Sequence, residues 1–328
     1  MKKKIAAAVF VLAVLISLYV ANGLLKIKSI DGVKQAEYMY YQPKNTVDVA
    51  FLGSSHVHCD VNTVELWDKY GIAAYDYSAA EQPLWVTYYY FKELMKYQKP
   101  KLVVIDLFTP ARIRENYRYR WIRDNLYGVR LSPNKIRMLL TAVEHDKLSI
   151  YFPSFGGYHS RWKELGRADL KYLIESPQKR AAFKGFTPYM GTEPQKRPTI
   201  TEKHLGGLSA KSEEYLRKII KYAADNDVEL MFVVAPYTIT DSDQLTYNQI
   251  EKILSEEGKE LINTNFMYDE MGLDFETDFN DFSHLNLQGT VKYTDFLAKY
   301  IKSEFDIPDR RQDERYSSWD KQKDYLFE

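Results

Sequence analysis

A serine turn near the start of the chain carries the first residue type that nucleophilic catalysis needs. Ser54 and Ser55 follow Gly53, which comes directly after the short apolar run 47–52. A hydroxyl at a strand-to-helix turn lies beside free backbone N–H groups and the positive end of the helix dipole, which favour developing negative charge. A hydroxyl of this turn is therefore a candidate nucleophile, although a serine after a glycine more often caps a helix or closes a turn.

A loop near the other end of the chain supplies the matching acid–base residues. Residues 281–286 read Asp-Phe-Ser-His-Leu-Asn. A histidine can accept the proton of a serine, and an aspartate three residues earlier can hold its imidazole in the required tautomer. His284 is therefore a candidate general base and Asp281 its orienting carboxylate. A D-x-x-H loop alone is more often a capping arrangement, so the inference depends on both segments together.

A metal-like pattern overlaps the serine turn. His56, His58 and Asp60 form an H-x-H-x-D run, a spacing by which metallohydrolases place two imidazoles and a carboxylate near a metal. The other histidines, at positions 145, 159, 204 and 284, form no second recognisable ligand pair. The sequence therefore favours a site without a metal, in which His56 is a pocket-wall residue that contacts substrate. A metal-dependent hydrolase that uses the run is the weaker alternative.

Five short apolar runs predict the strands that must position these residues. The runs are 47–52, 72–77, 101–107, 228–235 and 261–263, and such runs are typical of a parallel sheet covered on both faces. Helical patterns alternate with them at 62–71, 85–97, 212–224, 243–254 and 287–301. The alternation predicts an α/β three-layer sandwich with a central parallel sheet of about five strands, whose carboxyl edge holds the ligand.

The N-terminus predicts a membrane segment. Three lysines at positions 2–4 precede the uncharged run 5–25, whose length matches a hydrocarbon core of about 30 Å. The lysines place residues 1–4 in the cytoplasm and everything after the anchor outside, so we expect a single-pass cell-membrane protein with an extracytoplasmic domain. Cleavage as a signal peptide near residues 21–23 is the alternative.

The rest of the chain divides by composition. Residues 26–44 are expected to form a linker, residues 45–305 the outer domain and residues 306–328 a charged, solvated tail. Within the domain, residues 112–198 interrupt the alternation and are expected to form an insertion over the carboxyl edge of the sheet. In this insertion His159 and Trp162 are candidate substrate contacts.

Overall composition excludes several classes of protein. Lys plus Arg and Asp plus Glu number 45 each, so the chain lacks the basic excess of a dedicated nucleic-acid binder. Its one cysteine, Cys59, excludes an internal disulfide framework and a zinc site with several thiolates.

The serine turn at 53–55 and the loop at 281–286 together resemble the SGNH (GDSL-like) hydrolase superfamily. The resemblance covers residues 47–107 and 228–300. The resemblance implies a flavodoxin-like SGNH fold and a triad of Ser55, His284 and Asp281. It also implies backbone oxyanion donors at Ser55 and, after the second strand, at Ala79. The family's asparagine after the third strand has no counterpart here, because that loop reads Asp-Leu-Phe-Thr at 106–109.

The sequence Gly-Ser-Ser after a signal anchor looks most like a membrane-tethered branch of this superfamily. That branch includes the D-alanyl-lipoteichoic acid protein DltD and the exopolysaccharide O-acetylation proteins. The resemblance implies a cofactor-free O-acyltransferase or esterase that modifies a cell-surface polysaccharide or teichoic-acid-like polymer beside a membrane-bound O-acyltransferase (MBOAT). The opposing hypothesis is a non-catalytic SGNH-like scaffold that binds polymer or its membrane partner, which the missing asparagine would permit.

Overall fold

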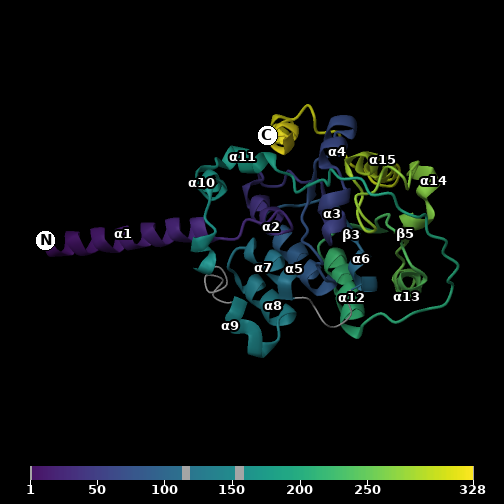
Figure 1. Cartoon of the computed structure of the whole chain (residues 1–328), viewed down its shortest axis with the longest axis horizontal. Coiled ribbons are helices and arrows are strands. Elements are labelled where there is room, and N and C mark those ends of the chain that lie inside the picture. The colour runs from purple at the N-terminus through teal and green to yellow at the C-terminus, as the bar shows by residue number, and fades with distance from the viewer. Residues whose placement is uncertain (1, 113–118, 152–158, 328) are drawn as a thin grey trace.

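A five-stranded, all-parallel sheet lies at the centre of the computed structural model, which describes residues 2–112, 119–151 and 159–327 (Figure 1). The strands are β1 (Val49–Leu52), β2 (Ala74–Asp76), β3 (Leu102–Asp106), β4 (Glu229–Val234) and β5 (Leu261–Asn263). They are arranged in the order β2-β1-β3-β4-β5. The order reverses between β1 and β3, and ligands of open α/β sheets bind at the carboxyl edge beside such a reversal.

Helices cover both faces of the sheet, which confirms the predicted three-layer sandwich. Alternate strand residues enter opposite cores: Ala50 and Leu52 face one, and Val49 and Phe51 the other. The first core contains α5 (Leu84–Leu94), α8 (Pro133–Ala142), α12 (Ala210–Asp225) and α13 (Asp241–Glu256). The second contains α4 (Thr63–Tyr70), α14 (Tyr268–Met271) and α15 (Leu287–Glu304). The remaining helix of the site region, α3 (Ser55–Asp60), connects β1 to α4.

Local sequence sets the ends of α4 as expected. The Asn62 side chain accepts hydrogen bonds from the backbone N–H groups of Val64 and Glu65, both at 3.1 Å. Gly71 ends the helix with a φ of 65°, a left-handed conformation that suits glycine. The backbone N–H of Asn62 donates to Thr294 Oγ1 at 2.8 Å, so the cap also ties α4 to α15.

The segment predicted as a linker is part of the folded domain. It contains α2 (Val33–Tyr38) and the 3₁₀ helix η1 (Met39–Tyr41). Val33, Ala36 and Met39 are completely buried, and Gln35 donates to the carbonyl oxygen of Gly185 at 3.1 Å. The prediction failed because the segment is short and polar overall, and its apolar face becomes visible only when it is packed.

The predicted solvated tail also packs against the domain. Tyr316 and Trp319 are buried, and Trp319 Nε1 donates to the carbonyl oxygen of Ala74 at 3.1 Å. Arg310 forms an ion pair with Asp48 at 2.7 Å. The prediction weighed the charges of this segment and overlooked the aromatic anchors between them. The segment also holds η6 (Glu314–Tyr316) and α16 (Gln322–Phe327).

The insertion is mostly helical. It follows α6 (Phe108–Arg112), and its described elements are α7 (Tyr119–Tyr127), α8, η2 (His145–Lys147), α9 (Leu148–Tyr151), η4 (His159–Lys163), α10 (Arg167–Ile174) and α11 (Pro177–Ala182). Its last part pairs with the site loop through a bridge between Tyr189 and Asn286. The connection from β5 to α14 contains η5 (Thr264–Phe266).

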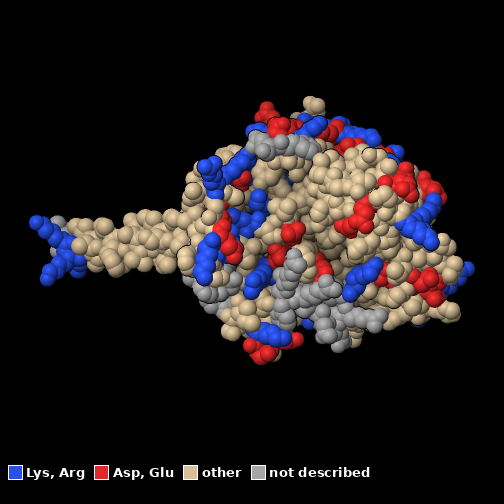
Figure 2. All heavy atoms as spheres, in the orientation of Figure 1, with Lys and Arg blue, Asp and Glu red and all other residues tan. Residues whose placement is uncertain are grey.

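One helix of the described residues is long and apolar enough to cross a membrane. Helix α1 (Lys2–Leu25) has 24 residues, and its most apolar window has a mean hydropathy of 2.4 and no buried residues. It extends away from the domain as a shaft with Lys side chains at its tip (Figure 2). Length and composition therefore fit a membrane span or a signal sequence.

Candidate active site

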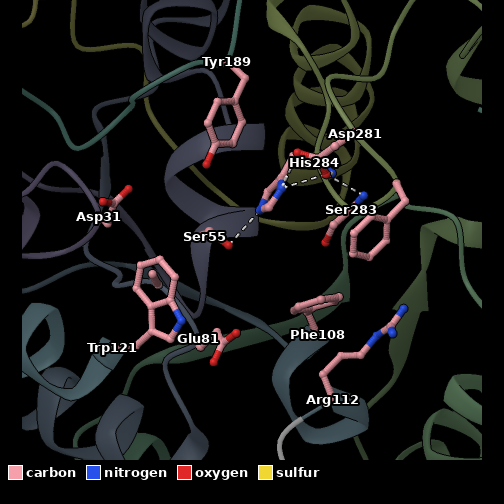
Figure 3. A pocket seen from close by; sticks show the side chains of 12 residues that line it. Asp31, Ser55, Glu81, Phe108, Arg112, Trp121, Tyr189, Asp281, Ser283 and His284 are labelled. Atoms are coloured by element: carbon pink, nitrogen blue, oxygen red, sulfur yellow. Dashed lines mark hydrogen bonds and ion pairs between the residues drawn. The ribbon is translucent and has the colours of Figure 1, made fainter. Parts of the chain in front are cut away.

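Three side chains from opposite ends of the chain form a hydrogen-bonded relay at the carboxyl edge of the sheet (Figure 3). Ser55 Oγ lies 2.9 Å from His284 Nε2, across 229 positions of sequence. His284 Nδ1 lies 3.1 and 3.2 Å from the two carboxylate oxygens of Asp281. These contacts are within the range in which a base can take a proton from a serine while a carboxylate orients it.

The turn after β1 presents Ser55 rather than Ser54 to the cavity. Gly53 has a φ of 154°, and a Cβ there would lie 2.8 Å from Cβ of Asp106, so the position requires glycine. Ser54 is completely buried, donates to Asp106 Oδ2 at 3.2 Å and caps α3 by accepting from the N–H of His56. Ser55 is the first residue of α3, where a backbone N–H has no partner within the helix.

The loop after residue 279 keeps Asp281 ionised. Its carboxylate accepts from the N–H groups of Ser283 at 2.8 Å and His284 at 3.0 Å, and from Asn280 Nδ2 at 2.9 Å. Burial opposes ionisation, but the hydrogen bonds from His284, Ser283 and Asn280 hold the pKa of Asp281 below its usual range. Because a carboxylate only accepts, it retains the hydrogen on His284 Nδ1 and leaves Nε2 to accept from Ser55.

The H-x-H-x-D residues point to three different partners. His56 Nε2 lies 2.9 Å from Ser283 Oγ, His58 Nδ1 lies 2.9 Å from Ser78 Oγ, and the N–H of Leu285 donates to Asp60 Oδ1 at 3.0 Å. Residues two apart share a face on a strand, but on helix α3 they are separated by about 200°. In the described part of the chain, no group of three His, Cys, Asp or Glu side chains is placed to hold a metal ion. The alternative metal site therefore has no ligand set here.

Two of the expected substrate contacts, His56 and Trp162, do not line the cavity. His56 is completely buried, stacks on Phe108 with ring centres 3.7 Å apart and lies edge-on to His284 at 5.2 Å. Burial first, and then the nearby His284, lower its pKa well below the usual value, so its imidazole is neutral. Trp162 lies on η4, 64% exposed and outside the cavity. The side chain of His159 is outside the described residues.

The relay opens into a cavity of about 490 Å³. Asp31, Glu81 and Trp121 lie across the cavity from His284, and Tyr189 lies above Ser55 (Figure 3). The other lining residues are Ala80, Phe108, Arg112, Asp281, Phe282 and Ser283. Sequence reasoning missed the acidic and aromatic wall because its members come from the supposed linker, the loop after β2 and the insertion.

The two expected oxyanion donors differ in how their N–H groups are used. The N–H of Ala79 donates to the carbonyl oxygen of Gly53 at 3.3 Å, and the N–H of Ala80 donates to that of Asp31 at 2.8 Å. In this conformation the loop uses the N–H of Ala79 to hold the nucleophile turn, and a role of Ala79 as an oxyanion donor stays a prediction. The N–H of Ser55 keeps the position expected of a first donor.

Comparisons with known proteins leave the family unassigned. No model of a known protein family matches the chain, and no curated protein matches it. One similar solved structure is described as BT4096, a gut microbial diltiazem-metabolizing enzyme, with 13% sequence identity and a TM-score of 0.25. The match covers 80% of this chain and 49% of that protein, so the chain spans about half its length. A TM-score this low does not show a shared fold, and the SGNH resemblance stays a prediction from the motifs.

Proposed function

We propose that the chain is a membrane-anchored serine acyltransferase or esterase of SGNH type. The observation that supports it best is the Ser55–His284–Asp281 relay, with contacts of 2.9 and 3.1 Å, at the mouth of a cavity. Ser55 and His284 are 229 positions apart in the sequence. They meet at the carboxyl edge of the parallel sheet, beside the point where the strand order reverses, which is where open α/β folds bind ligands.

The relay supports transfer in two steps. Ser55 Oγ attacks the acyl carbonyl carbon while its proton passes to His284 Nε2, and the N–H of Ser55 stabilises the oxyanion. The tetrahedral intermediate expels the first alcohol, which takes the proton from His284, and leaves acyl-Ser55. A second hydroxyl then attacks the acyl-enzyme and gives its proton to His284. The bond from the acyl carbon to Ser55 Oγ breaks, Ser55 Oγ takes that proton back from His284, and the new ester leaves. Water in place of that hydroxyl gives hydrolysis. Asp281 stabilises the imidazolium in both steps.

The cavity suits an acyl acceptor rich in hydroxyl groups. Asp31 and Glu81 supply hydrogen-bond acceptors for sugar or polyol hydroxyls, and Trp121 and Tyr189 supply aromatic surface against which a sugar ring packs. An anchor at α1 would keep the domain beside an envelope polymer. We therefore place the substrate among cell-surface polysaccharides or teichoic-acid-like polymers, with the domain extracytoplasmic and an MBOAT as the source of acyl groups.

A non-catalytic scaffold is the second candidate, and one observation favours it. The N–H groups of both Ala79 and Ala80 are engaged within the protein, so Ser55 is the single backbone oxyanion donor identified among the described residues. Loss of one oxyanion donor typically costs about 10²–10³-fold in kcat. Such a site would bind a polymer more readily than it would modify it.

Covalent trapping separates the two candidates. The full-length protein in detergent is treated with a fluorophosphonate probe, which labels activated serines. We expect labelling of the wild type and of Ser54→Ala, and loss of labelling in Ser55→Ala. Of the two serines, Ser55 is the one that is hydrogen-bonded to His284. A wild type that takes no label would favour the scaffold. A label that disappears in Ser54→Ala and persists in Ser55→Ala would move the nucleophile by one residue.

A further inference from the structure

The C-terminal end of α1 is fastened to the insertion by charged side chains. Lys28 Nζ donates to the carbonyl oxygen of Leu24 at 2.8 Å and to Asp169 Oδ1 at 2.6 Å. Arg161 donates to the carbonyl oxygen of Leu25 at 3.0 Å and to the same Asp169 oxygen at 3.1 Å. These cations satisfy carbonyl groups that a helix end leaves unpaired, and they tie that end to α10.

Helix α10 also packs directly on α1. A Cβ built on Gly23 would lie 2.7 Å from Leu173 Cδ1, so the glycine allows the two helices to approach closely. Helix α10 is in turn anchored in the domain through Tyr172, which is buried and stacks on Tyr38 with ring centres 6.4 Å apart. Because α10 contacts both α1 and the domain, α1 does not reach the domain through a free linker.

The surface around this junction exposes large apolar side chains. Trp162 is 64% exposed, Leu165 41%, Leu170 58% and Ile174 82%. Leu170 and Ile174 are four residues apart and so share one face of α10. Such apolar surface next to a membrane-spanning helix needs a partner to cover it.

Cations border these apolar side chains. Lys163, Arg167 and Lys171 are exposed, and none of the three takes part in the ion pairs found in the described part of the chain. Lys163 Nζ lies 5.4 Å from the centre of the Trp162 ring. Blue side chains are visible on the domain near the base of α1 (Figure 2). Leucine and tryptophan flanked by lysine and arginine are typical of helices that lie in a membrane interface and contact anionic headgroups.

We propose that this η4–α10 surface (Trp162, Lys163, Leu165, Arg167, Leu170, Lys171 and Ile174) lies in the interfacial layer of the bilayer that α1 crosses. The apolar run 5–25 spans the hydrocarbon core at about 30 Å, so the junction at Leu25 reaches the headgroups with no spacer. The apolar side chains enter the layer and the three cations bind anionic lipid headgroups. The inference takes α1 as a membrane span and does not depend on catalysis at Ser55. This contact holds the domain, and with it the cavity, in one orientation relative to the membrane.

Site-directed spin labels test the proposal in nanodiscs that contain the protein and lipid but no second membrane protein. Nitroxides are attached to Leu170→Cys and Ile174→Cys of the full-length chain. A control label at Phe266→Cys is on η5, between β5 and α14, which both lie at the far side of the domain from α1 (Figure 1), and Phe266 is 57% exposed. Cys59 is buried, and burial raises the pKa of its thiol, so it stays unlabelled in the folded protein.

The readout is the collision rate with oxygen, which concentrates in lipid, relative to that with a water-soluble nickel chelate. We expect the ratio at 170 and 174 to exceed that at 266 several-fold. Labels at 170 and 174 that behave like the one at 266 would overturn the proposal and leave the surface to a protein partner.

A charge-reversal variant tests the headgroup contact. In discs with phosphatidylglycerol, the combined K163E, R167E and K171E changes should lower the oxygen-to-nickel collision ratio of the label at 174, with a smaller effect in phosphatidylcholine discs. The same fall in both lipids would overturn the headgroup contact. Unchanged thermal unfolding controls for misfolding.

Discussion

At the scale of single residues, Ser55 and His284 are coupled by one hydrogen bond of 2.9 Å that exists only in the folded chain. Removal of either partner eliminates proton transfer, so removal of the second partner lowers the rate of acyl transfer little further. We expect Ser55→Ala and His284→Ala each to lower the rate of acyl transfer by at least about 10³-fold, and the double variant to be no slower than Ser55→Ala within about threefold. The measurement is the initial rate of ester cleavage by purified protein. Effects that multiply in the double variant would show that the two residues act independently.

The two motifs, together with their resemblance to the SGNH superfamily, were enough to predict this triad, but the sequence failed where the backbone conformation decides. Ser55, Asp281 and His284 were visible because a hydroxyl, a carboxylate and an imidazole each occur at an element boundary. The metal alternative at His56, His58 and Asp60 assumed a strand-like alternation, but on helix α3 His58 lies on a different face from His56 and Asp60. The role of Ala79 could not be decided from sequence, since the direction of its N–H depends on how two loops meet.

At the scale of elements, α3 braces the loop that carries the base. His56 contacts Ser283 and Asp60 accepts from Leu285, so α3 holds that loop on both sides of His284. We expect His56→Ala to lower kcat by about 10–100-fold with KM nearly unchanged, since a displacement near 1 Å at a catalytic group can cost about 10². His56 would then be a positioning residue.

His58→Ala is the matched control for this brace. His58 is equally buried, on another face of the same short helix, and contacts Ser78. A structural role alone predicts the same loss of stability and the same fall in kcat for both variants. A brace predicts that only His56→Ala lowers kcat per folded molecule, measured after correction for the folded fraction. Equal kcat losses would contradict the positioning role.

Asp106 joins the ends of two strands to the nucleophile turn and predicts a pH dependence of stability. It accepts from Ser54 Oγ and from the N–H groups of Phe108 and Ala235. Burial, only partly offset by these hydrogen bonds, raises its pKa from 3.8 to about 6. Because the folded pKa lies above the unfolded one, the contribution of Asp106 to stability is full below pH 3.8 and is lost as pH rises through about 6.

A pKa difference of one unit corresponds to about 1.4 kcal/mol, so the rise in the pKa of Asp106 from 3.8 to about 6 corresponds to about 3 kcal/mol of stability lost. Asp106→Asn cannot ionise and should lack this loss. Urea unfolding of both proteins in detergent at pH 4 and pH 7 measures the difference between their pH responses, in which the other titrating groups cancel. Parallel responses of the two proteins would show that Asp106 does not titrate in this window.

At the scale of the whole molecule, the sequence predicted the sheet and the helices that alternate with its strands well, and the segments 26–44 and 306–328 poorly. All five strands were located, because continuous apolar runs are the signature of strands buried on both faces. The segments 26–44 and 306–328 were misjudged, because each buries only a few side chains and has too short a periodic pattern to detect. The cavity wall was missed for a related reason: Asp31, Glu81 and Trp121 become neighbours only after the supposed linker and the insertion fold over the carboxyl edge.

The buried C-terminal segment gives a test of the whole fold. Trp319 is completely buried, lies near Trp67 with ring centres 6.1 Å apart, and has Lys184 Nζ 3.5 Å from its own ring centre. We expect Trp319→Ala to lower the free energy of unfolding by about 3–5 kcal/mol, the usual cost of truncating a buried large aromatic residue. That loss is a large fraction of the roughly 5–15 kcal/mol that stabilises a typical domain.

An exposed aromatic provides the control for this truncation. Phe266 is 57% exposed, and Phe266→Ala should change the free energy of unfolding by less than about 0.5 kcal/mol. Denaturant unfolding of the full-length chain in detergent measures both variants against the wild type. A solvated C-terminal appendage would make the two variants equally harmless. A folded segment that closes the edge of β2 makes Trp319→Ala far more damaging, and because Trp319 Nε1 donates to Ala74 in that strand, the loss should reach the sheet itself.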